Sequence, residues 1–539
     1  MQIRRSLLLS VILLIPIITT AAFLAVGFAT SSDPATGSVS GVVVDDDGPI
    51  AAARVRMRAT DHLTFSGLDG RFSLSELPEG SEIEITAWAD GYYIASTHVT
   101  PTVGGITLTL RPYHTVDHPD YQWISPISGT APRSCEDCHL AIMSQWATNA
   151  HGRAVSNPRF FSLYNGTDLT GTSQIDPGYL NDFPGTAGNC ANCHAPGAGV
   201  DGYLTTNMNA VRDVITAGLH CDYCHKIGGA YLNPATGSVY PNAPGVQSQR
   251  ILRPPAGDNI FFGPYDDAPD PDSYLPLMTQ SQYCASCHQF RMWGTPIYES
   301  YEEWLTSPYA AMGIHCQDCH MAPDGVTTNI APGTGGFERD PMTIATHLQP
   351  GAANVELLQK TVSMTLFARQ VVDRIEVAVT IANTGAGHHV PTDFPGRHLI
   401  LEIDAGDETG RSLAQLSGPV VPEWGGPQAG QPGQAYAKLL MDLASGDYPV
   451  VSYWKQALIV ADNRIPALAA DRSTYGFLLP AGADEIQLTA RLLFRRLFQN
   501  AADEKGWDKP DIIMVEEELT IPLETWHKAY LPLLMGSGS

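Results

Sequence analysis

A short Cys-x-x-Cys-His motif occurs five times in this chain and together the copies use all ten cysteines, so none is left for a disulfide. The copies are Cys135, Cys138 and His139; Cys190, Cys193 and His194; Cys221, Cys224 and His225; Cys284, Cys287 and His288; and Cys316, Cys319 and His320. Two thiols one helical turn apart can form thioethers with the vinyl groups of one porphyrin, and the adjacent histidine can bind its iron. The sequence therefore predicts five covalently bound c-type haems, with these cysteines as attachment sites and these histidines as proximal ligands.

The spacing of the motifs indicates an internal repeat. The intervals between first cysteines are 55, 31, 63 and 32 residues, so long and short steps alternate. The second and third motifs form one pair and the fourth and fifth another, and the later member of each pair follows a similar tripeptide that ends in His220 or His315. We expect a two-motif repeat preceded by one unpaired motif, with the haems of each pair in near contact.

Twelve histidines lie outside the motifs, enough to give every iron a second axial ligand. The favoured distal ligands are His151, His220, His315, His347 and His388. His151 lies too near its own motif to bend back, so we expect it to serve a different haem. His220 and His315 directly precede motif cysteines, while His347 and His388 lie in loops rich in Gly and Pro. The alternatives are His389, His114 and His118 or, through a thioether sulfur, Met143, Met312 and Met321.

The N-terminus has the features of an export or anchor segment. Arg4 and Arg5 precede an uncharged, apolar run of 24 residues, 6–29. This is longer than the apolar part of a signal peptide and long enough to span a bilayer. We expect residues 1–32 to form a transmembrane anchor in the cytoplasmic membrane, with the bulk of the chain on the periplasmic side. The alternative is cleavage after Ala29 and secretion.

Two regions with strand patterns flank the motifs. Short alternating runs and an Asp69-Gly70 turn predict a small β-sandwich at 37–111, and Ile375, Val377 and Val379 belong to an alternating run that predicts a second sandwich at 355–530. Residues 113–351 between them are rich in Gly, Pro, Asn, His and Cys, so we expect haems to fill that core. The predicted fold is multidomain: an N-terminal transmembrane helix, a small β-sandwich, a central pentahaem domain of helices and loops, and a C-terminal β-sandwich. Residues 536–539 are typical of an appended linker.

The first flanking region resembles the carboxypeptidase regulatory-like domain. The similar segments are "GVVVDDDGPIAAARVRM", "GLDGRFSLSELPEG" and "ITAWADGYY". This resemblance implies a small β-sandwich with a structural or adhesive role and no catalysis.

The motif region resembles the multihaem c-type cytochromes related to the tetrahaem electron carrier of ammonia oxidisers. The similar segments are "SCEDCHLAIMSQWATNAHGRA", "YCASCHQF", "YEEWLTSPYAAMGIHCQDCHMAP" and "NTGAGHHVPTDFPGRHLILEI". This resemblance implies electron transfer and mainly bis-histidine haems, and by position it favours His151, His347 and His388 as distal ligands. The chain departs from the tetrahaem carrier in its fifth motif and its two β regions, so haem pairing is not transferred from that family.

The net charge of the chain limits the classes of partner that it can bind. The chain has 56 acidic and 31 basic residues, a formal net charge of −25. Nucleic acid is excluded as a partner because its phosphates require Lys and Arg, whereas an acidic surface attracts basic or membrane-bound redox partners. The favoured function is a multihaem cytochrome that relays electrons between redox partners on the outer side of the cytoplasmic membrane, without catalytic residues. The alternatives are a reductase or oxidase of a small nitrogen or sulfur compound, and a subunit of an extracellular cytochrome filament.

Overall fold

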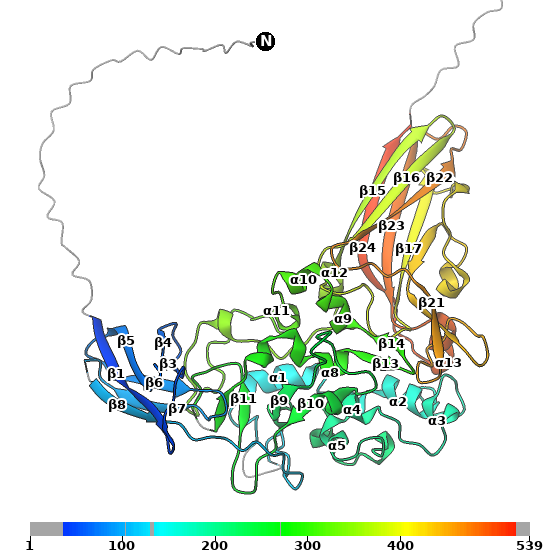
Figure 1. Cartoon of the computed structure of the whole chain (residues 1–539). Coiled ribbons are helices and arrows are strands. Elements are labelled where there is room, and N and C mark those ends of the chain that lie inside the picture. Colours follow the sequence, from blue (N-terminus) through cyan, green and yellow to red (C-terminus); the bar gives the residue numbers. More distant parts are fainter. Residues whose placement is uncertain (1–35, 103, 130–133, 270, 524–539) are drawn as a thin grey trace, which may run out of the picture.

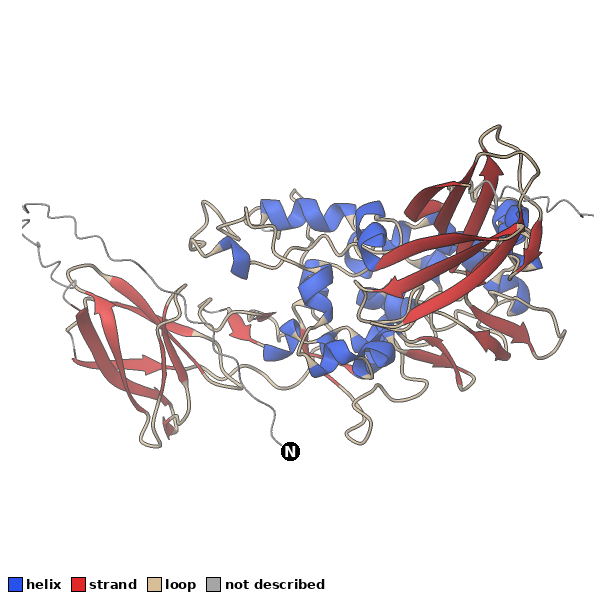
Figure 2. Ribbon diagram, turned by 90° about the horizontal axis from the view of Figure 1, so that it is seen from above, coloured by secondary structure: helices blue, strands red, loops and turns tan. Residues whose placement is uncertain are grey.

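The computed structural model describes residues 36–102, 104–129, 134–269 and 271–523. Two β-rich units lie on either side of a central region of short helices and loops (Figures 1 and 2). The N-terminal unit, blue in Figure 1, stands at one end of the central region, and the C-terminal unit rises from the other end. Most helices, blue in Figure 2, lie between the two β-rich units, and several of them contain motif residues.

The N-terminal unit consists of two four-stranded sheets. One contains β2 (Gly48–Pro49), β1 (Thr36–Asp45), β5 (Arg71–Pro78) and β8 (Gly104–Thr109), and the other β4 (Leu63–Phe65), β3 (Arg54–Met57), β6 (Ile83–Trp88) and β7 (Ala95–Val99). Val39 and Val43 of β1 pack in one buried cluster with Val55 of β3 and Ile85 of β6. The two sheets therefore share one core, as in a small β-sandwich.

Acidic residues of the central region join it to the N-terminal unit. Asp266 accepts hydrogen bonds from the guanidinium groups of Arg54, at 2.5 Å, and Arg56. Asp267 accepts one from the backbone N–H of Ala59 at 2.7 Å. Because Asp266 is buried, these ion pairs are shielded from solvent and hold the unit against the centre.

The central region is built from very short elements. Its helices are α1 (Leu140–Thr148), α2 (Pro158–Asn165), α3 (Tyr179–Asp182), α4 (Ala191–His194), α5 (Pro196–Gly199), α6 (Val214–Ala217), α7 (Cys221–Cys224), α8 (Ala285–His288), α9 (Ser300–Leu305), α10 (Pro308–Ala311) and α11 (Cys316–His320). Its 3₁₀ turns are η1 (Ala154–Ser156), η2 (Met208–Ala210), η3 (Gly245–Ser248), η4 (Pro276–Thr279), η5 (Ser281–Tyr283) and η6 (Pro341–Thr343). Three two-stranded ladders pair β9 (Ile227–Ala230) with β10 (Gln249–Ile251), β11 (Phe261–Gly263) with β12 (Asp272–Tyr274), and β13 (Phe290–Met292) with β14 (Thr295–Tyr298).

The C-terminal unit is a sandwich of two four-stranded sheets. One has the order β15 (Val362–Val371), β16 (Arg374–Asn383), β22 (Ala470–Leu478), β18 (Gln415–Ser417), and the other β19 (Gly433–Tyr436), β17 (His398–Asp407), β23 (Glu485–Arg495), β24 (Ile512–Pro522). The hairpin of β20 (Lys438–Asp442) and β21 (Ala457–Asp462), the 3₁₀ segment η7 (Glu423–Gln428) and helices α12 (Val355–Thr361) and α13 (Gln499–Lys505) complete it. The alternating residues Ile375, Val377 and Val379 of β16 are all buried, so the predicted inward face of this strand is confirmed.

The predicted transmembrane helix is wrong for the described part of the chain. No helix within residues 36–102, 104–129, 134–269 and 271–523 is long and apolar enough to cross a membrane. The longest, α1, has nine residues and so a length of about 14 Å, against a bilayer core of roughly 30 Å. The residues for which the helix was predicted, 1–32, lie outside the described ranges, as do 536–539.

Candidate haem sites

Each motif forms a single helical turn. The backbone N–H of the motif histidine donates to the carbonyl of the first cysteine, at 2.9 Å between His139 and Cys135 and at 3.1 Å between His288 and Cys284. This i to i+4 bond brings the two thiols to the same side of the turn and places the imidazole directly after it. The local fold therefore has the geometry that thioether attachment and axial ligation require.

Four motif histidines have the Nδ1 atom hydrogen-bonded, which leaves Nε2 available for a metal. For three of them the acceptor is a backbone carbonyl: Ile330 O for His139 at 3.1 Å, Phe262 O for His225 at 2.6 Å, and Pro350 O for His320 at 2.7 Å. For His288 the acceptor is the Asp393 carboxylate, at 3.3 Å. These bonds fix each ring and its tautomer, as expected of iron ligands.

Two of these imidazoles face a second imidazole across a fixed gap. The ring centres of His151 and His288 are 6.2 Å apart, and those of His320 and His388 are 6.4 Å apart. Imidazole–metal bonds of about 2 Å place the centres of two rings on opposite sides of one metal roughly 6 Å apart. The second ring of each pair is also held through Nδ1, His151 by Gln349 Oε1 and His388 by the His389 carbonyl. The fourth and fifth motifs therefore fit a haem iron bound between two histidines.

His347 lies near two further motif histidines. Its ring interacts electrostatically with His225 and His139, the ligand candidates of the third and first motifs. Its backbone is tied to the helix that follows the first motif, because its N–H donates to Gln145 Oε1 at 2.7 Å and its carbonyl accepts from Asn149 Nδ2 at 2.6 Å. The Nδ1 atom of His347 is buried without a hydrogen-bond partner among the described residues, as expected of a group awaiting a ligand.

His194 has an aromatic neighbour on the face of its ring. Its ring stacks on Phe160 of α2 with a centre-to-centre distance of 4.2 Å and an interplanar angle of 26°. The second motif therefore differs in its surroundings from the fourth and fifth.

His220 and His315 are bound as helix caps. His220 precedes α7, and its Nδ1 accepts the backbone N–H of Tyr223 at 3.3 Å. His315 precedes α11 and forms a capping box with Asp318. A neutral imidazole whose Nδ1 accepts carries its proton on Nε2. The Nε2 atom of His220 is buried without a hydrogen-bond partner among the described residues, as is Nδ1 of His347. Both residues thus hold the start of a motif helix in place.

Burial keeps the candidate ligands neutral. It lowers the pKa of His151, His194 and His347 to about 4, so these imidazoles carry no charge at neutral pH. A metal ligand must be deprotonated, and these shifts favour that form. His288 is the exception: burial lowers its pKa, but the hydrogen bond and charge of Asp393 together raise it to about 9.

Contacts between thiols show which motifs are neighbours. The Cys135 thiol of the first motif bonds that of Cys221 in the third. In the same way Cys193 of the second motif contacts Cys287 of the fourth, and Cys284 of the fourth contacts Cys316 of the fifth. The thiols of the fourth and fifth motifs are thus neighbours, whereas those of the second and third have thiol neighbours in the fourth and first.

Known proteins match two parts of the chain. Residues 38–111 match the model of the carboxypeptidase regulatory-like domain, and residues 134–226 match that of cytochrome c554 and c-prime. The two resemblances noted in the sequence are confirmed. The segment that carries the first three motifs is therefore similar to multihaem c-type cytochromes. The match to cytochrome c554 and c-prime covers the first three motifs, so c-type haem binding is supported there by family as well as by geometry.

Solved structures show a similarity in fold over a larger part of the chain. A penta-heme cytochrome c552 from Thermochromatium tepidum is 20% identical, with a TM-score of 0.52 over 72% of this chain and 97% of that chain. A family 123 glycoside hydrolase from Clostridium perfringens is 7% identical over 25% of this chain and 24% of that chain, and its TM-score of 0.10 is too low to indicate a shared fold. No curated protein matches the chain.

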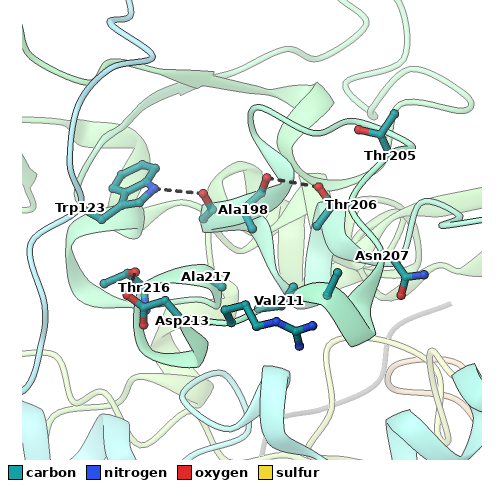
Figure 3. Close-up of a pocket in the computed structure, with 12 residues that line it drawn as sticks. Trp123, Ala198, Thr205, Thr206, Asn207, Val211, Asp213, Thr216 and Ala217 are labelled. Carbon is teal, nitrogen blue, oxygen red and sulfur yellow. Dashed lines mark hydrogen bonds between the residues drawn. The ribbon is translucent and has the colours of Figure 1, made fainter.

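A cavity of about 430 Å³ lies beside the second motif (Figure 3). Its polar groups are already engaged: Trp123 Nε1 donates to Gly197 O at 3.0 Å, and Thr206 Oγ1 to Ala198 O. The Asp213 carboxylate caps α6. The cavity is therefore mainly apolar.

Three residues that support the motifs were not predicted from the sequence. Asp393 and Gln349 hold His288 and His151, yet each is one polar residue in a loop far along the chain. Gly245 adopts φ +61°, and a Cβ atom there would lie 2.0 Å from Asn192 O and 2.9 Å from Cys193 Sγ. Its position after a proline gave a turn signal, but nothing in the sequence related that turn to the second motif.

Proposed function

We propose that this cytochrome carries five haems and relays single electrons between redox partners outside the cytoplasm. The observation that carries the proposal is the placement of His151 opposite His288 and of His388 opposite His320. An iron with two histidine ligands has no free coordination position for a substrate, so it exchanges electrons without binding one. The haems supply the redox chemistry when bound, and the chain positions and shields them.

In this proposal each motif histidine is a proximal ligand and each cysteine pair a haem attachment. His151 and His388 are the distal ligands of the fourth and fifth motifs, and His347 serves the neighbourhood shared by the first and third. His220 and His315, predicted as ligands, also cap motif helices, since each Nδ1 accepts a backbone N–H. The thiol contacts provide neighbouring steps between the first and third, second and fourth, and fourth and fifth motifs.

The partners proposed are basic redox proteins. The net charge of −25 attracts positively charged surfaces over a distance set by ionic strength. Stopped-flow reduction of the cytochrome by a basic carrier should therefore slow as salt is raised. A rate that is independent of salt would remove the argument for charge-steered partners and leave the relay itself in place.

A second candidate, a reductase or oxidase of a small molecule, is favoured by one observation. Among the described residues no ring pair gives His194 a second imidazole about 6 Å away, so the second motif is one whose iron has no assigned distal ligand. Counting high-spin and low-spin haems by magnetic circular dichroism and electron paramagnetic resonance separates the two functions. Five low-spin haems support the relay alone, whereas one stoichiometric high-spin haem that binds cyanide or nitrite supports the enzyme.

A further inference from the structure

One loop of the C-terminal sandwich reaches the fourth and fifth motifs together. It leaves β16, and its residues His388 and Asp393 contact neighbouring motifs. The His388 ring faces His320 of the fifth motif, and Asp393 Oδ2 accepts the Nδ1–H of His288 in the fourth at 3.3 Å. The two motifs themselves touch through Cys284 and Cys316. This loop therefore contributes a group to each of two adjacent sites.

Resting on the proposed function, we infer that Asp393 is a positioning residue that gives the haem of the fourth motif a more negative reduction potential than that of its neighbour on the fifth. The two sites differ in the acceptor at the proximal ring, a carboxylate for His288 and the Pro350 carbonyl for His320. On the distal side both acceptors are neutral, Gln349 Oε1 for His151 and the His389 carbonyl for His388. The negative charge of Asp393 is thus the main difference in how the axial rings are held.

The carboxylate of Asp393 is fixed in place by its surroundings. Ser300 Oγ donates to Asp393 Oδ1 at 2.5 Å and lies 2.9 Å from Thr392 Oγ1. The Asp393 side chain is only 11% exposed, so little water weakens its charge. Its backbone adopts φ +63°, a left-handed conformation that Asp tolerates better than most residues. Such a conformation persists where the surrounding contacts impose it, and here it directs the carboxylate to His288.

The chemistry follows from the direction of the hydrogen bond. His288 Nδ1–H donates to an anion, so electron density shifts through the ring to Nε2 and makes this nitrogen a stronger donor. A stronger axial donor stabilises the ferric state relative to the ferrous state and lowers the potential. Backbone carbonyls at His139, His225 and His320 have the same effect to a smaller degree because they are neutral.

Spectroelectrochemical titration of the full-length, haem-loaded cytochrome tests the inference. Asp393→Asn keeps the shape of the side chain and the preference for a left-handed backbone but removes the charge. We expect the reduction equilibrium constant of one haem to rise tenfold or more, which raises its midpoint potential by about 59 mV for one electron. The matched control is Asp324→Asn, which removes an exposed carboxylate near the fifth motif that bonds only its own turn. The electron paramagnetic resonance signal of one low-spin haem should differ from that of the wild type in Asp393→Asn and should match it in Asp324→Asn.

A second variant covers the case in which Asp393→Asn does not fold. Ser300→Ala releases Asp393 Oδ1 from its donor while leaving the carboxylate, and should move the same midpoint by a smaller factor. Gln349→Glu places a carboxylate at the distal ring and should shift that midpoint downward. If the folded variants leave every midpoint within the spread of the control, the inference is overturned. Wild-type haem content and electron-transfer rates are measured in the same samples, so a failure of the relay itself is recognised separately.

Discussion

The C-terminal sandwich and the central region of this protein are stabilised in different ways. The sandwich has one buried cluster of 25 apolar residues, whereas the apolar clusters within the central helices have five members at most in the described chain. Burial of apolar surface, at about 25 cal/mol per Å², can hold the sandwich without help. The central region lacks a core of comparable size, so its stability depends on the groups attached to the motifs.

The two regions are nevertheless locked together by buried charges. Lys438 of the sandwich donates to the carbonyls of Pro296 and Ile297 in the centre, and Arg464 bonds the carboxylate of Glu303 at 2.6 Å. A rigid sandwich thereby presents His388 and Asp393 to the fourth and fifth motifs at fixed positions. The sandwich therefore supports the central region and fixes the position of its fourth and fifth motifs.

Preventing haem attachment should have the largest effect on the difference in stability between the sandwich and the central region. The protein can be produced in cells that lack the enzymes that link haem to cysteine. We then expect the central region to lose its fold, because contacts with haem take the place of an apolar core in that region. Limited proteolysis with mass spectrometry should show cleavage throughout 134–351 and survival of a fragment spanning 362–522. Equal resistance of both regions would mean that the central helices fold without haem.

Removing one ligand should affect one site and the contact between the regions. His388→Ala takes away the imidazole opposite His320, and we expect one haem of five to become high-spin or to gain water as a ligand. The matched control is His389→Ala, whose ring lies toward Glu303. Resonance Raman spectra of both variants decide the matter. A high-spin signal from the control alone would reassign the ligand to His389.

The sequence predicted the parts of this comparison that have a regular pattern. Alternation along 375–381 gave the inward face of β16, and five identical spacings gave the motif turns. The neighbours of each motif could not be predicted from the sequence. The contact between Cys135 and Cys221, for example, depends on the path of the long loops between them. His220 and His315 stay predictions as ligands for a related reason: a histidine before a motif cysteine suits both a ligand and a helix cap, and each Nδ1 accepts a backbone N–H.

A core substitution should destabilise the sandwich and leave the motifs unchanged. Leu401 of β17 is fully buried in the large cluster, and Leu401→Ala should cost about 2–5 kcal/mol through lost transfer energy and the cavity it leaves. Leu458→Ala, at a half-exposed position of β21, is the matched control and should cost far less. Denaturant unfolding followed by hydrogen exchange of the backbone amides in 398–407 and by haem absorbance measures the two regions separately. Simultaneous loss of both signals would show that they unfold as one unit.

The smallest effect tests the lock between the regions. Lys505 ends α13 of the sandwich unit, and its ammonium group donates to three central carbonyls, Ser162 O at 2.9 Å, Thr167 O at 3.0 Å and Ile175 O at 2.7 Å. Lys505→Met keeps the length of the side chain but leaves these carbonyls without their donor, at a cost of about 1–3 kcal/mol. The control is Lys360→Met, at an exposed lysine paired only with Glu356 on its own helix. Hydrogen exchange of the backbone amides in 158–175 should quicken in the first variant and stay unchanged in the second. Unchanged exchange in both would mean that the neighbouring bond from Trp507 Nε1 to Ser162 Oγ, at 3.1 Å, is sufficient to hold this edge of the centre against the sandwich.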